Sequence, residues 1–344
     1  MSAKDQLKRF IASQPLLEKS MFYAYRWQKG NAVDAEIERR RKIDLFDIEQ
    51  LSQDIAFGPE ERVIDNNLYG YASYLKKYAG IKSDLKAYME HGLFLGGIVH
   101  PDQFHWHFPK IITLSEQRRE ILAAKIPGKE SLAVGPYIHY ATSLLEAEEQ
   151  AKLKARLGKT LLVYPFHSMK NVKAGFNDQE LINEIKRVAK DFDSVLICLY
   201  YLDARDPVKV AAYRAEGFHL VTAGHRFDRH FIARQRSHIE LANLTMSNGM
   251  GTQTGFCVYL NKPHYIYQQH IDQKASSLKE LKRFEAGGSA GSVKERVAAE
   301  RAYFSQLFSE LRMDISAEQR AVTADYWGFE SVQEAAFLQN YFSA

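Results

Sequence analysis

A regular alternation of short apolar runs and helical patterns over residues 159–267 is the sequence feature that most restricts the fold. In the segment 178–192, for example, Leu181, Ile185 and Val188 recur at helical spacing and share one face. Because parallel strands must be joined by crossover connections, this alternation predicts an open, doubly wound α/β sheet. The expected strands are 159–166, 194–202, 219–223, 244–247 and 264–267, and the expected helices are 178–192, 207–216, 228–242 and 252–260.

The first half of the chain shows weaker patterns of the same kind, so we expect a second, less regular α/β unit there. We place the boundary in the charged stretch 146–158, which gives expected domains at 1–150 and 151–344. The expected elements of the first half are strands at 63–64, 88–90, 111–114 and 132–134 and a helix at 115–125 capped by Ser115. Those of the C-terminal part are a flexible Gly/Ser-rich loop at 285–292 and helices at 293–313 and 331–342.

Composition narrows the class of protein. Hydrophobic residues make up 46% and charged residues 26%, which is typical of a folded domain. The net charge of +4 suits phosphate-bearing ligands, but the basic residues are scattered, which argues against a nucleic-acid binder. The first ten residues are polar and no apolar stretch is long enough to cross a bilayer. Cys198 and Cys257 lie in apolar runs and are expected to be buried free thiols, so we expect a cytoplasmic protein.

Small and hydrogen-bonding residues gather where the strands of the second half end. Ligands of open α/β sheets bind outside the carboxyl ends of the strands, so these residues are candidates for a donor site. They are His167 and Ser168 after the first strand, Gly224, His225 and Arg226 after the third, and Ser247, Asn248, Gly249, Gly251, Thr252 and Gln253 after the fourth.

The segment after the fourth strand is the most informative. Gly249 and Gly251 let the backbone approach a ligand, and Thr252 opens a helix whose free amides and positive dipole end favour a phosphate. A tight strand-to-helix turn that merely needs glycine is the alternative. Arg226 is likewise suited to phosphate, and a salt bridge to a neighbour such as Asp228 is its alternative role.

Glu90, His91 and Gly92 follow a short strand of the first half. The pKa of histidine lies near neutrality, so His91 is a candidate general base, and Glu90 a candidate for orienting its ring. Gly92 and Tyr137 are candidates for the acceptor side of a cleft. An ordinary core histidine and an ordinary turn remain the alternatives.

A second histidine cluster surrounds Trp106. His105 and His107 form an HxH pair and His100 lies nearby, which is one pattern of zinc sites. No cysteine or further ligand set accompanies them, so we expect no metal site.

Several of these blocks resemble bacterial capsule and O-antigen glycosyltransferases of the GT-B type. The resemblance lies in 224–228 with Phe231, in 247–252 and in 261–264, and further blocks at 90–92, 135–138 and 326–329 are similar. It implies two Rossmann-like domains facing across a cleft, with C-terminal helices crossing back to the first domain. The second domain would bind the nucleotide and the first the acceptor.

The resemblance also bears on the chemistry. GT-B enzymes typically need no metal or other cofactor, which is consistent with the absence of a DxD carboxylate pair here. GT-B enzymes that use CMP-sugars place a His-Pro pair at the first strand end, whereas His167 is followed by Ser168, so the donor nucleotide stays open. No paired-glutamate motif of the retaining type is present, which favours inversion.

We therefore expect a glycosyltransferase that moves a sugar from a nucleotide-sugar donor to a surface-glycan acceptor, free or lipid-linked. A nucleotide-sugar epimerase on the same scaffold and a non-catalytic module that binds glycan or nucleotide are the alternatives. The basic stretch 39–42 is a candidate for peripheral contact with the inner face of the cytoplasmic membrane, and a solvated helix face is its other interpretation.

Overall fold

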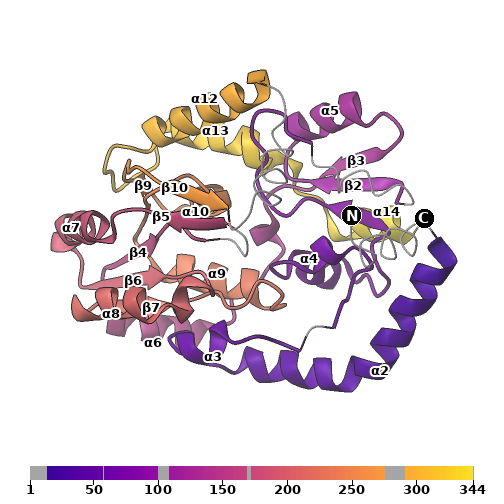
Figure 1. Cartoon of the computed structure of the whole chain (residues 1–344), viewed down its shortest axis with the longest axis horizontal. Helices are drawn as coiled ribbons and strands as arrows, with labels where there is room; N and C mark the ends of the chain where they lie inside the picture. Colours follow the sequence, from indigo (N-terminus) through magenta and orange to yellow (C-terminus); the bar gives the residue numbers. More distant parts are fainter. Residues whose placement is uncertain (1–13, 57, 100–107, 169–171, 276–290, 344) are drawn as a thin grey trace.

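The computed structural model describes residues 14–56, 58–99, 108–168, 172–275 and 291–343, and Figure 1 shows two α/β halves side by side. The second half is built on a five-stranded parallel sheet in the order β7-β6-β4-β8-β9, so all five expected strands are confirmed. They are β4 (Thr160–Tyr164), β6 (Ser194–Cys198), β7 (His219–Val221), β8 (Leu244–Ser247) and β9 (His264–Ile266).

The four expected crossover helices of the second half are also confirmed. They are α7 (Asp178–Val188), α8 (Pro207–Ala215), α9 (Phe231–Leu241) and α10 (Thr252–Tyr259). Local chemistry sets their starts: Asn177 caps the first turn of α7, and Asp206 caps α8, which then begins with proline. The apolar face of α7 is buried against β4, where Leu161 and Val163 are fully enclosed. Burying each such side chain contributes about 1.5–3 kcal/mol to folding.

The first half contains a three-stranded parallel sheet in the order β1-β2-β3. Its elements are α4 (Tyr71–Ala79), β1 (Ala87–Met89), β2 (Lys110–Thr113), α5 (Glu116–Lys125) and β3 (Glu130–Ala133). Ser115 caps α5 as expected, because its side chain accepts a hydrogen bond from the Arg118 N–H. The strand expected at 63–64 is wrong: a 3-10 helix, Ile64–Asn67, begins there, and the Asn67 amide donates to the Val63 carbonyl and holds the turn.

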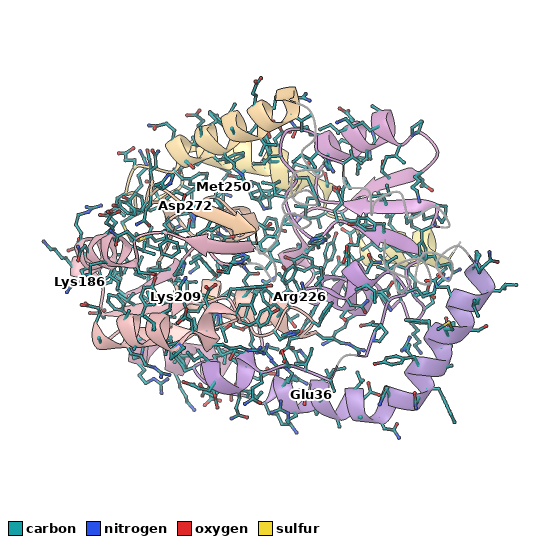
Figure 2. The ribbon with its side chains drawn as sticks, in the orientation of Figure 1. Glu36, Lys186, Lys209, Arg226, Met250 and Asp272 are labelled. Carbon is teal, nitrogen blue, oxygen red and sulfur yellow. The ribbon has the colours of Figure 1, made fainter. Side chains whose placement is uncertain are left out.

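The charged stretch 146–158 is helix α6 (Ala147–Leu157), closed at its start by a reciprocal capping box between Glu146 and Glu149. Two further helices near the N-terminus are α2 (Pro15–Arg41) and α3 (Ile48–Ser52). Figures 1 and 2 show α2, which carries Glu36, along the outer edge of the molecule. The chain then reaches the second half, because Ile48 is fully buried in the core of that half.

The C-terminal helices return to the first half. They are α12 (Gly291–Leu307), α13 (Ala317–Trp327) and α14 (Ala335–Ser343). The Lys110 ammonium of β2 donates to the Tyr341 carbonyl of α14 at 2.6 Å, and the Gln333 amide donates to the Ala133 carbonyl at 3.0 Å. The crossing back is therefore confirmed.

An antiparallel pair, β5 (Val172–Gly175) and β10 (Asp272–Ala275), was not expected. Most of the loop expected at 285–292 lies outside the described residues, and its last two residues begin α12. Among the described helices, none combines the length and the apolar character needed to cross a bilayer.

Candidate functional site

A cavity of about 340 Å³ lies between the two halves, at the carboxyl ends of β4, β6 and β8. The first half contributes Tyr69, Tyr71 and His91 to its wall, and the second half contributes the remainder. This is the edge where the strand-end residues were predicted to meet. The predicted site residues on the wall are His91, His167, Gly249, Gly251, Thr252 and Gln253.

The turn between β8 and α10 is held from behind by buried polar side chains. The Ser247 hydroxyl donates to the Gly249 carbonyl at 2.9 Å and lies 3.0 Å from Nε2 of His264. Asn248 Oδ1 accepts a hydrogen bond from the Phe166 N–H at 2.6 Å. Ser247 and Asn248 therefore shape the turn from within the protein, whereas Gly249 lies on the cavity wall.

The start of α10 faces the cavity without a side-chain cap. Gly251 occupies the N-cap position and makes no capping hydrogen bond, so the positive end of the helix dipole is directed toward the cavity. The carboxamide of Gln253 lies over Gly251. Thr252 Oγ1 accepts a hydrogen bond from the Leu93 N–H of the first half at 3.2 Å. This arrangement suits an anionic group such as a phosphate.

His91 lies opposite α10, with its ring 6.5 Å from that of Tyr69 and 6.3 Å from that of Phe94. Its Nδ1 is buried and has no hydrogen-bond partner among the described residues. The expected orienting contact from Glu90 is therefore not made to that atom. The Glu90 carboxylate instead binds the Arg118 guanidinium at 2.6 Å and accepts from the Thr113 hydroxyl at 2.6 Å. No local pattern indicated Arg118 as this partner, because it lies on a helix 28 residues away.

The two residues expected on the acceptor side differ in position. Gly92 adjoins α10: a Cβ there would lie 3.3 Å from Thr252 Oγ1. Tyr137 is buried, donates to the Glu90 carbonyl at 2.6 Å and packs its ring 4.6 Å from that of Tyr71. Tyr71 is the ring on the cavity wall, so the expectation that Tyr137 lines the cleft is corrected to a supporting position.

Of the two predicted residues that follow β4, only His167 lines the cavity. The His167 ring stacks on Tyr200 with centroids 4.3 Å apart, and both lie on the wall. Ser168 is instead held by Asp203, whose carboxylate accepts from the Ser168 N–H at 3.2 Å.

The residues after β7 mostly support the fold. Gly224 has a φ of 96° and packs against the Arg234 guanidinium and Asp228. The His225 N–H donates to the Leu51 carbonyl, and desolvation lowers the pKa of the His225 imidazole to about 4, so it is neutral at pH 7. These two expected donor contacts therefore lie behind the cavity.

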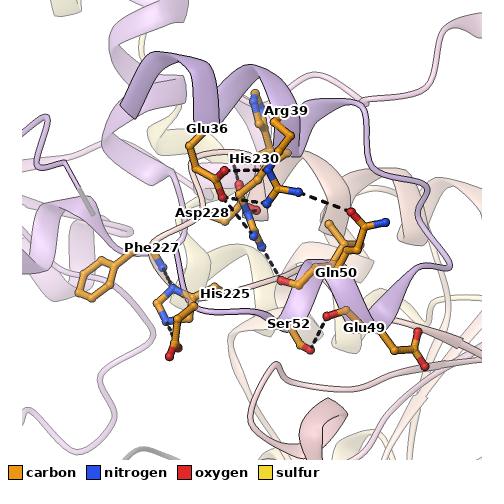
Figure 3. A network of polar contacts seen from close by, with 12 residues as sticks. Glu36, Arg39, Glu49, Gln50, Ser52, His225, Phe227, Asp228 and His230 are labelled. Carbon is orange, nitrogen blue, oxygen red and sulfur yellow. Dashed lines mark hydrogen bonds and ion pairs between the residues drawn. The ribbon is translucent and has the colours of Figure 1, made fainter. Parts of the chain in front are cut away.

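Arg226 does not pair with Asp228, which was the alternative considered for it. Asp228 binds Arg40 at 2.5 Å and Arg234 at 2.8 Å, and Figure 3 shows Asp228 close to the end of α2. The Arg226 Nε is buried without a hydrogen-bond partner in the described part of the chain, and the Arg226 carbonyl accepts from the Tyr69 N–H. Figure 2 places Arg226 near the middle of the molecule.

Sequence reasoning missed several residues of the wall. Tyr69, Phe231, Gln235 and Arg301 all line the cavity. Arg301 comes from α12, more than one element beyond the sheet, and no local pattern could have assigned it. Phe231 and Gln235 lie one turn apart near the start of α9, so the position of that helix was their only signal.

The histidine cluster at 100–107 lies outside the described residues. Within the described ranges, no group of three or more histidine, cysteine or acidic residues is arranged to hold a metal ion.

Comparison with known proteins gives faint likenesses. No protein-family model and no curated protein matches the chain. Among solved structures, the wall teichoic acid polymerase TagF is similar at 14% identity over 69% of this chain and 57% of TagF, with a TM-score of 0.34. S. aureus MnaA, solved with UDP, is similar at 9% identity over 83% of this chain and 80% of MnaA, with a TM-score of 0.40. The UDP-GlcNAc 2-epimerase from Neisseria meningitidis, bound to UDP-GlcNAc, is similar at 12% identity over 84% of this chain and 82% of the epimerase, with a TM-score of 0.33.

Likenesses this faint carry no functional argument, so the fold is assigned from the topology itself. Two parallel α/β sheets lie on either side of one cavity, and the last helices return to the first half. The chain therefore has the GT-B arrangement of two Rossmann-like halves.

Proposed function

We propose that this chain is a glycosyltransferase that moves a sugar from a nucleotide-sugar to an acceptor hydroxyl. The observation that carries the proposal is that one cavity holds both His91 of the first half and the uncapped start of α10 in the second. A proton acceptor on one side and an anion site on the other are what a displacement at an anomeric carbon requires.

The reaction follows from those two groups. His91 takes the proton of the acceptor hydroxyl as its oxygen forms a bond to the anomeric carbon. The bond between that carbon and the phosphate oxygen breaks, and the nucleotide leaves with the electron pair. The amides at Gly251 and Thr252 stabilise the departing phosphate. General-base assistance is typically worth about 10²–10⁴-fold in rate. Attack opposite to the leaving group inverts the anomeric carbon, and no metal takes part in this scheme.

The acceptor is proposed to be a surface glycan, free or lipid-linked, as in capsule or O-antigen synthesis, and the protein to work in the cytoplasm. The resemblance of the motifs supports this choice. Contact with the inner membrane face would use the exposed Arg39, Arg41 and Lys42, because Arg40 is buried in an ion pair.

Epimerisation of the donor is the rival reaction on the same scaffold. It usually needs acid and base carboxylates, and no aspartate or glutamate belongs to the described residues that line the cavity. An epimerase converts its donor alone, whereas a transferase needs the acceptor.

The test begins with a thermal-shift screen against UDP, GDP, CMP and dTDP, because a ligand of the native state raises the melting temperature. The sugar donors of the nucleotide that binds are then incubated with and without surface-glycan acceptors. We expect product only with acceptor, and a loss of about 10²-fold or more in His91→Ala. His219→Ala, a change at an exposed histidine at the start of β7, away from the carboxyl ends of the strands, is the matched control. Conversion of donor without acceptor, or full activity of His91→Ala, would refute the proposal.

A further inference from the structure

We propose that the sugar bound in this cavity is neutral, with hydroxyl or acetamido groups and no carboxylate. The inference rests on the proposed function, because it concerns the sugar of the same donor. It separates hexose-type donors from those whose sugar is an acid, such as a uronate or a sialic acid, which the sequence left open.

Among the residues that the structure describes, the buried part of the cavity wall is uncharged. Its members include Tyr71, Tyr164, Cys198, Gln235 and Phe256, each less than a tenth exposed. Burial raises the pKa of the Cys198 thiol to about 12 and raises that of the Tyr164 phenol as well, so both are neutral at physiological pH. A carboxylate placed here would lose its hydration without gaining a cation.

Two arginines come near this wall. Arg226 acts electrostatically on Tyr69 and Tyr200 but does not line the cavity, and Arg234 is already paired. Arg234 precedes Gln235 on α9, but its guanidinium binds Asp228 at 2.8 Å. Burial alone would raise the pKa of Asp228. The attraction of Arg234 and Arg40 outweighs this effect, so the pKa of Asp228 is lowered. The carboxylate is therefore ionised and balances the charge of Arg234.

Positive charge is found at the mouth instead. Arg301 is exposed and lines both this cavity and an adjoining hollow of about 270 Å³, which shares Phe166, Gly249 and Met250 with it. Met250, one of the shared residues, is labelled in Figure 2. Arg301 and the start of α10 therefore both border the turn between β8 and α10. The diphosphate of a donor would be held there, and its sugar would extend toward the uncharged wall.

The uncharged wall offers one hydroxyl that the described part of the protein does not use. The Tyr164 hydroxyl is buried and has no hydrogen-bond partner among the described residues, although the residue is 7% exposed and lines the cavity. An unpartnered buried hydroxyl contributes nothing to folding, so a ligand hydroxyl that pairs with it recovers the lost hydrogen bond. The neutral carboxamide of Gln235 can both donate and accept on the same wall.

The experiment is calorimetry on the full chain with matched donors of the nucleotide that binds. For a uridine nucleotide these are UDP, UDP-glucose, UDP-N-acetylglucosamine and UDP-glucuronate; for a cytidine nucleotide they include CMP-sialic acid. We expect the neutral sugars to bind at least as tightly as the bare nucleotide and the acidic sugars about 10- to 100-fold more weakly. Tighter binding of the acidic sugar would overturn the inference and leave the proposed function standing. Binding of no nucleotide at all would defeat both.

Two tyrosine variants separate a ligand role from a structural one. Tyr164→Phe should leave the melting temperature unchanged or raised, keep the affinity for the bare nucleotide, and weaken the neutral-sugar donor about 10-fold. Tyr213→Phe is the matched control, because the Tyr213 hydroxyl is buried but donates to Asp178 at 3.2 Å and is not on the wall. It should lower the melting temperature and leave every affinity unchanged. An unchanged donor affinity in Tyr164→Phe would overturn the role of the hydroxyl and with it the neutral-sugar site.

Discussion

The backbone N–H of Leu93 donates a hydrogen bond to Thr252 Oγ1 at 3.2 Å, and this bond joins the two halves at the cavity. Leu93 lies two residues after His91, and Thr252 is the first residue of α10. This bond is one of the contacts that position the proposed base relative to the proposed phosphate site, beside the hydrogen bond from the Tyr69 N–H to the Arg226 carbonyl.

Removing that contact should affect turnover more than donor binding. Thr252→Val keeps the shape of the side chain but loses the acceptor, so we expect a stability loss of only about 1 kcal/mol. Transfer should fall by about 10- to 100-fold, since a displacement of about 1 Å between reacting groups can cost that much. Steady-state kinetics beside calorimetry with the bare nucleotide would check this. An equal loss in both would mean that Thr252 acts on the donor alone.

Filling the approach to α10 should abolish nucleotide binding. The three atoms nearest to a Cβ at Gly251 all belong to the end of the flexible Gln253 side chain, which can move aside, so Gly251→Val should fold normally. The added methyls would stand in front of the amides that bind the phosphate. Gly128→Val is the matched control, because Gly128 has open space around its Cα and an ordinary backbone conformation. Calorimetry should show no binding for the first variant and wild-type affinity for the second.

The second half was predictable because its information is local. Strands buried on both faces have near-continuous apolar runs, and capping residues such as Asn177 mark the helix starts within one turn. The β5–β10 pair escaped prediction because its two strands lie almost a hundred residues apart and pair only with each other. Helix α2 was not predicted, because exposed apolar residues such as Leu16 and Trp27 obscure the difference between an apolar and a polar face.

The candidate site was predictable only in part, for a related reason. The turn at 247–252 and His91 carry signals in their own sequence, namely glycines before a helix and a histidine after a strand. The partner of Glu90 and the position of Tyr137 depend on which elements pack together, and Arg301 reaches the cavity only because α12 returns to it. Such contacts between distant segments leave no local pattern.

Helix α2 should owe its attachment to one buried ion pair. Arg40 is 1% exposed and binds Asp228, whereas the neighbouring Arg39 is 46% exposed and binds Glu36 (Figure 3). Arg40→Met removes two buried hydrogen bonds of a charged group, to Asp228 and to the Leu51 carbonyl, while Arg234 still pairs with Asp228, so it should cost on the order of 3 kcal/mol. Arg39→Met should cost about 0–1 kcal/mol. Urea unfolding of the two variants gives the comparison, and equal losses would rule out this anchor.

Stability should fall as the pH drops below 6.5, and His264 is one cause. Desolvation lowers the pKa of the His264 imidazole from its ordinary value of 6.5 to about 3. Its buried neighbours are neutral: the Thr245 hydroxyl at 2.8 Å, the Ser247 hydroxyl at 3.0 Å and the ring of Phe308. Between pH 6.5 and 3 the unfolded chain therefore binds a proton that the folded chain does not.

By linkage, the stabilising contribution of this neutral histidine is fully present above pH 6.5 and is lost as the pH falls toward 3. Within that window the slope is about 1.4 kcal/mol per pH unit for each such histidine. His264→Gln retains a neutral side chain that can hydrogen-bond to Ser247 but cannot titrate, so its free energy of unfolding should be lower at pH 7 and depend less steeply on pH. Urea unfolding of both proteins at pH 7.5, 6.5, 5.5 and 4.5 measures the two slopes. Parallel curves would show that the pKa of His264 is the same in the folded and unfolded states. That result would contradict the burial of its imidazole behind the turn.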